Sequence, residues 1–153
     1  VLGVHDCYTL IQNIKTTAVR FNHSSRVAEK IAHFLNDHPS IVKVYYPTLP
    51  DHPGRDIHLT QSTSGGAIVS FQLPSYEFTK KFVEAMKIPV FAVSLGGVES
   101  ILSYPAKMSH AAMEPDEREK RGITNGLLRL SVGLEHEDDL IADLEQALAK
   151  ALL

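Results

Sequence analysis

An arginine interrupts an apolar segment near the carboxyl end of the chain. Residues 127–133 read LLRLSVG, and Arg129 is the third of them. Side chains of a strand alternate between its two faces, so Leu128 and Leu130 would share one face while Arg129 lies on the other. A guanidinium keeps its charge and is costly to bury without a carboxylate or phosphate partner. Arg129 is therefore predicted to bind an anion, and an ion pair with one of the 18 acidic residues is the structural alternative.

Two glycine-containing segments could bind an anion as well. They read SLGG at residues 94–97 and SGG at residues 64–66. Glycine lets backbone N–H groups approach a ligand, but turns between strands use the same residues. Each segment by itself therefore indicates a turn as readily as an anion site.

The eight histidines and the single cysteine form no pattern typical of a metal or nucleophile site. No HExxH motif occurs, and no histidine is paired with cysteines at the spacing of a zinc site. Ordinary surface and capping histidines are expected, and no metal site is predicted. Cys7 lies among apolar residues of a predicted helix without a histidine at a recognisable spacing, so it is interpreted as core filler.

Composition excludes several classes of function. The chain has 153 residues, of which 44% are hydrophobic, and this is enough for one compact domain. A net charge of -3 without a basic run favours neither a nucleic-acid nor an anionic-membrane partner. One cysteine cannot form an internal disulfide, and no stretch approaches the roughly 18 to 20 apolar residues of a membrane span. A cytoplasmic setting is expected, and the absence of an initiator Met suggests a start within a longer protein.

Hydrophobic spacing predicts a mostly helical start that stops at His38-Pro39. A strand at 41–47 and a long polar loop at 48–64 should follow. The next strand, 67–73, leads to Pro74-Ser75, which is expected to cap a helix with Phe78 and Phe82 on one side.

The second half predicts further short strands. PVFAV and VESIL are interpreted as two strands separated by a turn at SLGG. A polar excursion at 104–121 should contain one helical turn at 115–120, and the last helix should begin within 135–139. The pattern predicts an α/β or α+β fold, with a small, mostly antiparallel sheet of about four strands covered by helices on one face.

The segments VSLGGVESILSYPAKMSHAAM and RGITNGLLRLSVGLEHEDDLIADLEQAL resemble the carboxyl-terminal domain of the Cys/Met-metabolism family of pyridoxal-phosphate (PLP) enzymes. LGVHDCYTLIQNIKTTAVRFNHSSRVAEKIAHFLNDHPSIVKVYYPTLPDHP is similar to the stretch that joins the large and small domains of these enzymes. The resemblance implies a fold-type I PLP enzyme. Residues 1–38 would form a helical linker to a PLP domain outside this chain, and residues 39–153 the small domain that binds the substrate carboxylate.

The resemblance also implies roles for individual residues. Arg129 matches the family arginine that binds the substrate α-carboxylate, and Ser94 matches the serine whose main chain helps to hold it. Val93 and Leu95 would line the pocket for the sulfur-bearing side chain. The family's Schiff-base lysine and its other PLP ligands lie upstream of the matched region, so no catalytic or cofactor-binding residue is assigned within the chain. The isolated chain is expected to be inactive.

Within the family, the quoted segments are most similar to bacterial cystathionine β-lyases or γ-synthases. The implied function is a PLP-dependent carbon–sulfur lyase of transsulfuration and methionine biosynthesis, with cystathionine β-lyase preferred. Cystathionine γ-synthase, cystathionine γ-lyase and methionine γ-lyase are the alternatives, and a non-catalytic interaction module is the alternative from another class. The implied substrate is a small sulfur amino acid, and the full-length enzyme is expected to be a homotetramer.

Overall fold

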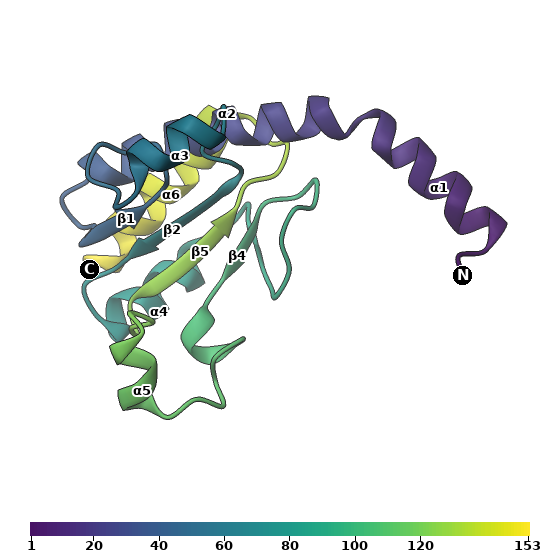
Figure 1. Cartoon of the computed structure of the whole chain (residues 1–153). Coiled ribbons are helices and arrows are strands. Elements are labelled where there is room, and N and C mark those ends of the chain that lie inside the picture. The colour runs from purple at the N-terminus through teal and green to yellow at the C-terminus, as the bar shows by residue number, and fades with distance from the viewer.

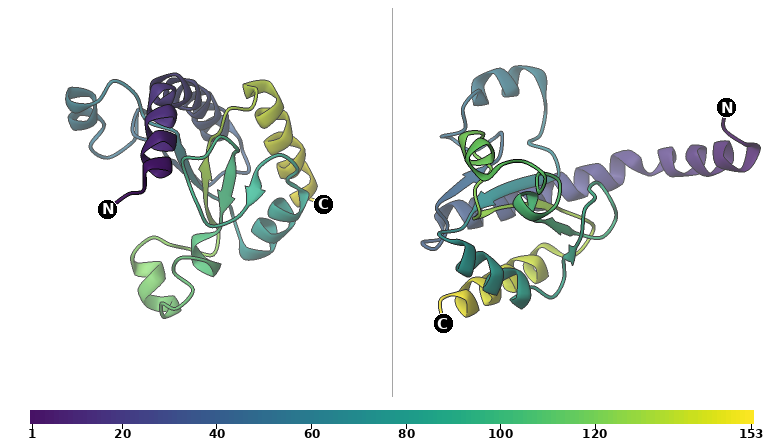
Figure 2. Two further views of the ribbon diagram at one scale, coloured as in Figure 1. Left: turned by 90° about the vertical axis from the view of Figure 1, so that its right-hand side faces the viewer. Right: turned by 90° about the horizontal axis from the view of Figure 1, so that it is seen from below.

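The chain begins with two helices that follow one another almost without a break. The computed structural model, which describes all 153 residues, places α1 at Val4–Lys15 and α2 at Thr17–Asp37. α2 packs on the sheet, whereas α1 projects away from the rest of the molecule (Figures 1 and 2). No residue of α1 is buried. The helical start is confirmed, but Cys7 is exposed, so its interpretation as core filler is wrong.

Five strands form one sheet in the order β1-β2-β5-β4-β3. They are β1 (Lys43–Tyr45), β2 (Ile68–Gln72), β3 (Val90–Phe91), β4 (Ile101–Ser103) and β5 (Leu127–Ser131). Neighbouring strands are antiparallel except β3 and β4, which are parallel. The mostly antiparallel sheet is confirmed, with one strand more than expected. Because β3 and β4 run in the same direction, SLGG belongs to a returning connection and is not a simple turn between them.

Helices cover one face of this sheet. α4 (Tyr76–Ala85) and α6 (Glu137–Ala151) pack against each other behind the strands in Figure 1, and α2 contacts both α6 and the sheet. Buried apolar side chains of these helices and of the strands form a single core. We call the side of the sheet that faces this core the covered face and the other side the open face. The α/β fold with helices on one face of the sheet is therefore confirmed.

Alternation along the strands assigns residues to the two faces. The fully buried apolar residues of β2 and β5 belong to the covered face: Val69, Phe71, Leu128 and Leu130. Their neighbours Ser70 and Arg129 belong to the open face and are partly exposed. The predicted separation of Arg129 from the leucines of its strand is confirmed.

Local sequence signals fix the starts of two helices in the covering layer. The Ser75 hydroxyl accepts a hydrogen bond from the Phe78 N–H at 3.1 Å and so caps α4. α6 begins at Glu137, inside the predicted stretch, and the His136 side chain accepts from the Asp138 N–H. The acidic first turn of α6 suits the positive end of the helix dipole.

The polar stretch after β1 contains a helix that the sequence did not predict. α3 (Arg55–Gln61) lies within the expected loop and buries none of its residues, so no apolar stripe reveals it. The helical turn expected later in the chain is present as α5 (Pro115–Lys120), and a single 3-10 turn, η1 (Pro105–Lys107), precedes it. None of the helices has the combination of length and hydropathy that crossing a bilayer requires.

Candidate anion-binding site

A row of side chains crosses the open face of the sheet. Backbone pairing places Ser70 and Ser103 on either side of Arg129. Tyr45 follows next to Ser70 on the outer strand. Directly paired residues of neighbouring strands point to the same side of a sheet. Arg129 therefore stands in the middle of the open face, between two short hydroxyl side chains.

The Arg129 guanidinium is held from one side only. Its Nη2 donates to the Ser94 carbonyl oxygen at 2.9 Å and to the Ser103 hydroxyl at 3.2 Å. Its Nε is buried and has no hydrogen-bond partner. None of the five ion pairs of the protein includes Arg129. The structure thus provides no carboxylate for the structural ion pair that was the alternative, and the charge of the guanidinium is not neutralised within the protein.

Ser103 connects Arg129 to the edge of the sheet. Its side chain is 4% exposed, and its hydroxyl donates to the Ala92 carbonyl oxygen at 2.8 Å while it accepts from Arg129. The same hydroxyl therefore fixes both the guanidinium and the chain that leads from β3 to Ser94. Sequence reasoning missed Ser103, because its position beside Arg129 follows from strand register and not from spacing along the chain.

The segment 94–100 is fastened to the end of β5. The Gly96 N–H donates to the Ser131 hydroxyl at 2.9 Å, and the Val98 carbonyl oxygen accepts from the Leu134 N–H at 2.8 Å. Together with the Ser94 contact to Arg129, these bonds hold the segment at its beginning and its middle. The loop that carries the predicted site residues thus has a defined position next to the carboxyl end of β5.

Glu135 fixes the end of the same segment. Its carboxylate accepts from the Ser100 N–H at 2.7 Å and from the Ser100 hydroxyl at 2.8 Å, and that hydroxyl accepts from the Gly133 N–H at 2.9 Å. A Cβ at Gly133 would lie 2.4 Å from the Val98 carbonyl oxygen. Glycine is required there because the loop backbone passes so close to β5. Glu135 and Gly133 were not predicted as site residues, since their partners lie more than thirty positions away.

A family model matches almost the whole chain. The model of the family described as "Cys/Met metabolism PLP-dependent enzyme" matches residues 1–149. The chain belongs to this family. The resemblance inferred from the sequence is thereby confirmed.

Three members of the family illustrate the range of relatives. Cystathionine β-lyase MetC of Bacillus subtilis is 60% identical over 148 residues, which cover 97% of this chain and 38% of the relative. L-methionine γ-lyase of Fusobacterium nucleatum subsp. polymorphum is 46% identical, with 98% and 38% covered. The crystal structure of cystathionine γ-lyase from Lactobacillus plantarum, complexed with L-serine, superposes with a TM-score of 0.92 at 38% identity, covering 99% of this chain and 40% of that one. The chain thus spans about two fifths of the length of these relatives.

The residues of this chain do not assemble a PLP site of their own. Such a site needs a lysine for the cofactor aldehyde, a partner for the ring nitrogen and donors for the phosphate. All nine lysines are exposed. Asp143 is the one buried carboxylate, and its oxygens already accept from the backbone N–H groups of Lys87 and Ile88 at 2.8–3.2 Å. These observations single out no lysine and no free buried carboxylate of this chain for the family's cofactor.

The residues that the family resemblance selected lie together beside Arg129. Ser94 is in direct contact with the guanidinium through its carbonyl oxygen, which leaves only its N–H and hydroxyl as groups that could hold a carboxylate. Val93 and Leu95 flank it with 66% and 56% of their surfaces exposed. Both apolar side chains are thus free to line a substrate pocket, although the chain by itself does not enclose one around them.

Proposed function

We propose that this chain provides the substrate-carboxylate site of a PLP-dependent carbon–sulfur lyase, with cystathionine β-lyase as the preferred activity. The observation that carries the proposal is the partly buried Arg129 guanidinium, which lacks a carboxylate partner and keeps a buried, unpaired Nε. Membership of the family and 60% identity to a cystathionine β-lyase support the choice of reaction.

Arg129 would bind and orient the amino-acid substrate. A planar guanidinium can give two parallel hydrogen bonds to a carboxylate, and these fix both its distance and its plane. Ser103 and the Ser94 carbonyl hold Nη2 in place, so the substrate meets a donor whose direction is already set. Orientation of the bound substrate decides which of its bonds is aligned for cleavage, and this is the contribution that we assign to the open face.

The PLP cofactor and the catalytic lysine would be supplied by a preceding domain of a longer enzyme. We assign residues 1–38 to a helical linker and residues 39–153 to the small domain. The apolar side chains of α1 support the linker role of that helix, because Leu10, Ile11 and Ile14 are 50–61% exposed and nothing in this chain covers them, whereas α2 packs on the sheet of the small domain. The purified 153-residue chain should accordingly show no Schiff-base absorbance with PLP that borohydride reduction removes, and it should not turn over cystathionine.

The apolar Val93 favours a broad range of sulfur amino-acid substrates, as in a methionine γ-lyase, as the second candidate function. An acidic side chain at this position could pair with the distal ammonium of cystathionine, whereas valine cannot. Apolar fit alone would give selectivity of only about 10 to 200-fold among sulfur amino acids. Val93 therefore supports methionine γ-lyase activity as an alternative, whereas cystathionine γ-synthase and cystathionine γ-lyase activity are alternatives that rest on family membership.

Product analysis of the longer enzyme tests the proposal. Incubation with L-cystathionine should release pyruvate, homocysteine and ammonia if the β-lyase assignment is right. Release of 2-oxobutyrate would show γ-cleavage in place of the proposed β-cleavage. Absence of any PLP-dependent turnover of cystathionine, methionine or homocysteine would favour the non-catalytic interaction module.

A further inference from the structure

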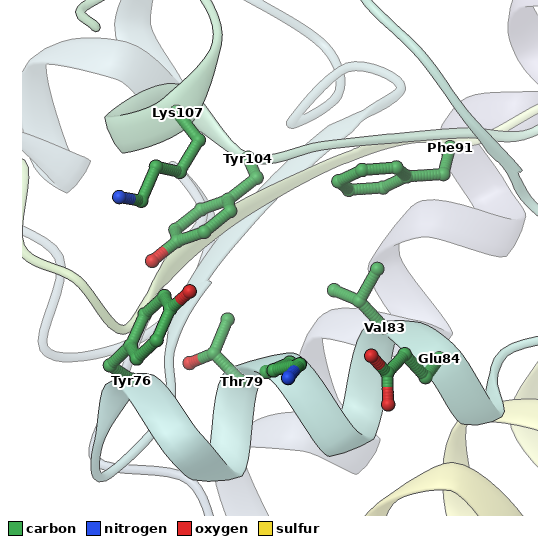
Figure 3. A pocket seen from close by; sticks show the side chains of 8 residues that line it. Tyr76, Thr79, Val83, Glu84, Phe91, Tyr104 and Lys107 are labelled. Atoms are coloured by element: carbon green, nitrogen blue, oxygen red, sulfur yellow. The ribbon is translucent and has the colours of Figure 1, made fainter.

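A cavity lies on the covered side of the sheet, between α4 and the edge formed by β3 and β4. Its volume is about 690 Å³. The side chains around it come from α4, from β3, from Tyr104 just before η1 and from Lys107 at the end of η1 (Figure 3). They are Tyr76, Thr79, Lys80, Val83, Glu84, Phe91, Tyr104 and Lys107. Phe91 pairs with Leu102, which pairs with the covered-face residue Leu130. The cavity therefore opens on the opposite side of the sheet from Arg129.

The two ends of the cavity differ in character. Phe91 and Val83 face each other at one end, and Tyr76, Tyr104 and Lys107 gather at the other (Figure 3). Glu84, the one carboxylate of the lining, lies near Val83 and away from the lysine end (Figure 3). A ligand that fills this space would thus meet apolar surface along its length and the Lys107 ammonium at one end, and Lys80 of α4 adds a second positive charge to the lining.

The Lys107 ammonium has no carboxylate partner within the protein. It lies 5.5 Å from the centroid of the Tyr76 ring, and none of the ion pairs includes it. The Tyr104 hydroxyl donates to the Asn125 carbonyl oxygen at 2.8 Å, and burial raises the pKa of Tyr104, so this ring stays neutral. A free cation beside two aromatic rings matches the charge and shape of an aromatic anion.

The walls of the cavity are fixed before any ligand arrives. Ser75 caps α4 at the cavity side, and the buried Asp143 holds the chain just before β3 through the N–H groups of Lys87 and Ile88. Tyr76 and Phe91 nevertheless leave 42% and 49% of their surfaces exposed. Large rings that stay uncovered between rigid walls, in a cavity within the usual range of about 300 to 1,000 Å³, are typical of a small-molecule site.

We propose that this cavity binds a small aromatic carboxylate, with its rings between Phe91, Val83 and Tyr76 and its carboxylate at Lys107. The ring surfaces supply apolar contact, and the ammonium supplies a charge-assisted hydrogen bond that a neutral ligand cannot use in the same way. The carboxylate form of a ligand should therefore bind at least about tenfold more tightly than its uncharged isostere.

Biphenyl-4-acetate and its neutral isostere biphenyl-4-acetamide test this proposal by NMR titration of the ¹⁵N-labelled chain. Biphenyl-4-acetate should bind saturably with a Kd below about 1 mM and shift the amide signals of Val83, Phe91 and Tyr104. The acetamide should bind at least about tenfold more weakly. No saturable binding, equal affinities for the two ligands, or shifts centred on Arg129 would overturn the proposal.

Two substitutions and one control locate the charge and the cavity. Lys107→Glu should reduce the affinity for biphenyl-4-acetate to that for the acetamide, and Val83→Trp should abolish the binding of both by filling the space. Lys43→Glu makes the same charge change on β1, at the far edge of the sheet, where Lys43 also lies over a tyrosine ring. It should leave both affinities unchanged. An equal loss of affinity in the Lys43 and Lys107 variants would show that only net charge matters and would contradict the proposal. If Val83→Trp does not fold, the result for Lys107→Glu decides whether the proposal holds.

Discussion

The two faces of the sheet use the same strands for opposite purposes. On the covered face, β2 and β5 contribute Val69, Phe71, Leu128 and Leu130, all fully buried among the helices. On the open face, the residues between them are partly exposed and mostly polar, and Arg129 stands there without an ionic partner. An alternating sequence thus separates the part of each strand that stabilises the fold from the part that can meet a ligand.

The difference between the two faces also shows how a charged side chain can be positioned for a ligand without an ion pair inside the protein. The covered face fixes the backbone of β5, so Arg129 needs no ion pair of its own to be placed. Hydroxyl and carbonyl groups then orient its guanidinium without neutralising it. If this division holds, matched substitutions on the two faces should differ in their effect on the free energy of unfolding.

Neighbouring residues of β2 should differ most. Phe71 is fully buried, and its ring meets Phe82 edge-on at a centroid distance of 5.9 Å. Phe71→Ala should lower the free energy of unfolding by about 3 to 5 kcal/mol because it leaves a cavity in the core. Ser70→Ala, one residue earlier on the open face, should change it by less than about 0.5 kcal/mol. Urea unfolding followed by circular dichroism measures both, and similar losses would refute the division between the faces.

Glu135 connects the segment 94–100 to the chain that follows β5. Its loss should lower the free energy of unfolding by an intermediate amount. Glu135→Ala leaves the N–H of the fully buried Ser100 without an acceptor and should cost about 1 to 3 kcal/mol of unfolding free energy. The control is Glu99→Ala, which removes an exposed carboxylate one residue from Ser100. Urea midpoints of the two variants should differ clearly. A Glu135 variant as stable as the Glu99 variant would show that the carboxylate does not hold the loop.

Two adjacent tyrosines, one buried and one on the open face, allow the same comparison at neutral pH. Tyr46 is fully buried and its hydroxyl donates to the Gly66 carbonyl oxygen at 2.9 Å, whereas Tyr45 lies on the open face. Tyr46→Phe should cost about 1 kcal/mol at neutral pH because it leaves that carbonyl without its donor. Tyr45→Phe should cost less than about 0.5 kcal/mol. Unfolding in urea at pH 7 compares them, and an equal cost would count against the contrast.

The same buried tyrosine should limit stability in alkali. Burial, with a smaller contribution from the nearby Glu29, raises the pKa of Tyr46 far above its ordinary value of 10.0. The unfolded chain therefore loses this proton near pH 10 while the folded chain keeps it, so the contribution of Tyr46 to the unfolding free energy is constant below about pH 9 and falls above pH 10. Tyr46→Phe should make this fall shallower, although Tyr104 still contributes to it. An unchanged slope would show that Tyr46 ionises in the folded state.

Strong local signals made much of the fold predictable. The alternation around Arg129, the Ser75 cap and the acidic start of α6 each depend on residues close together in the sequence. The family resemblance, in turn, selected Arg129 and Ser94, which the structure brings into contact. The predictions of local structure succeeded because neighbouring residues determine the face of a strand and the first turn of a helix, whereas the substrate-binding roles of Arg129 and Ser94 stay predictions.

The remaining features depend on contacts between distant segments. The parallel pairing of β3 with β4 arises only when the chain returns along the sheet, and the sequence around SLGG suits a turn equally well. Ser103 and Glu135 gain their roles from partners in other strands and loops. The interpretation of Cys7 as core filler was wrong for a related reason. Apolar spacing in α1 predicts a buried side of the helix, but no other part of this chain covers it.

The most direct test of the proposed carboxylate site is Arg129→Lys in the longer enzyme, with kcat/KM for cystathionine and the unfolding free energy measured on the same preparation. Lysine keeps the charge but loses the planar pair of donors. We predict that kcat/KM falls by about one to two orders of magnitude while stability is unchanged, because a charge-assisted contact of roughly 1.5 to 3 kcal/mol is lost only when substrate is bound. A variant that unfolds readily yet keeps full specific activity in its folded fraction would contradict the account, since Arg129 would then serve the fold and not the substrate.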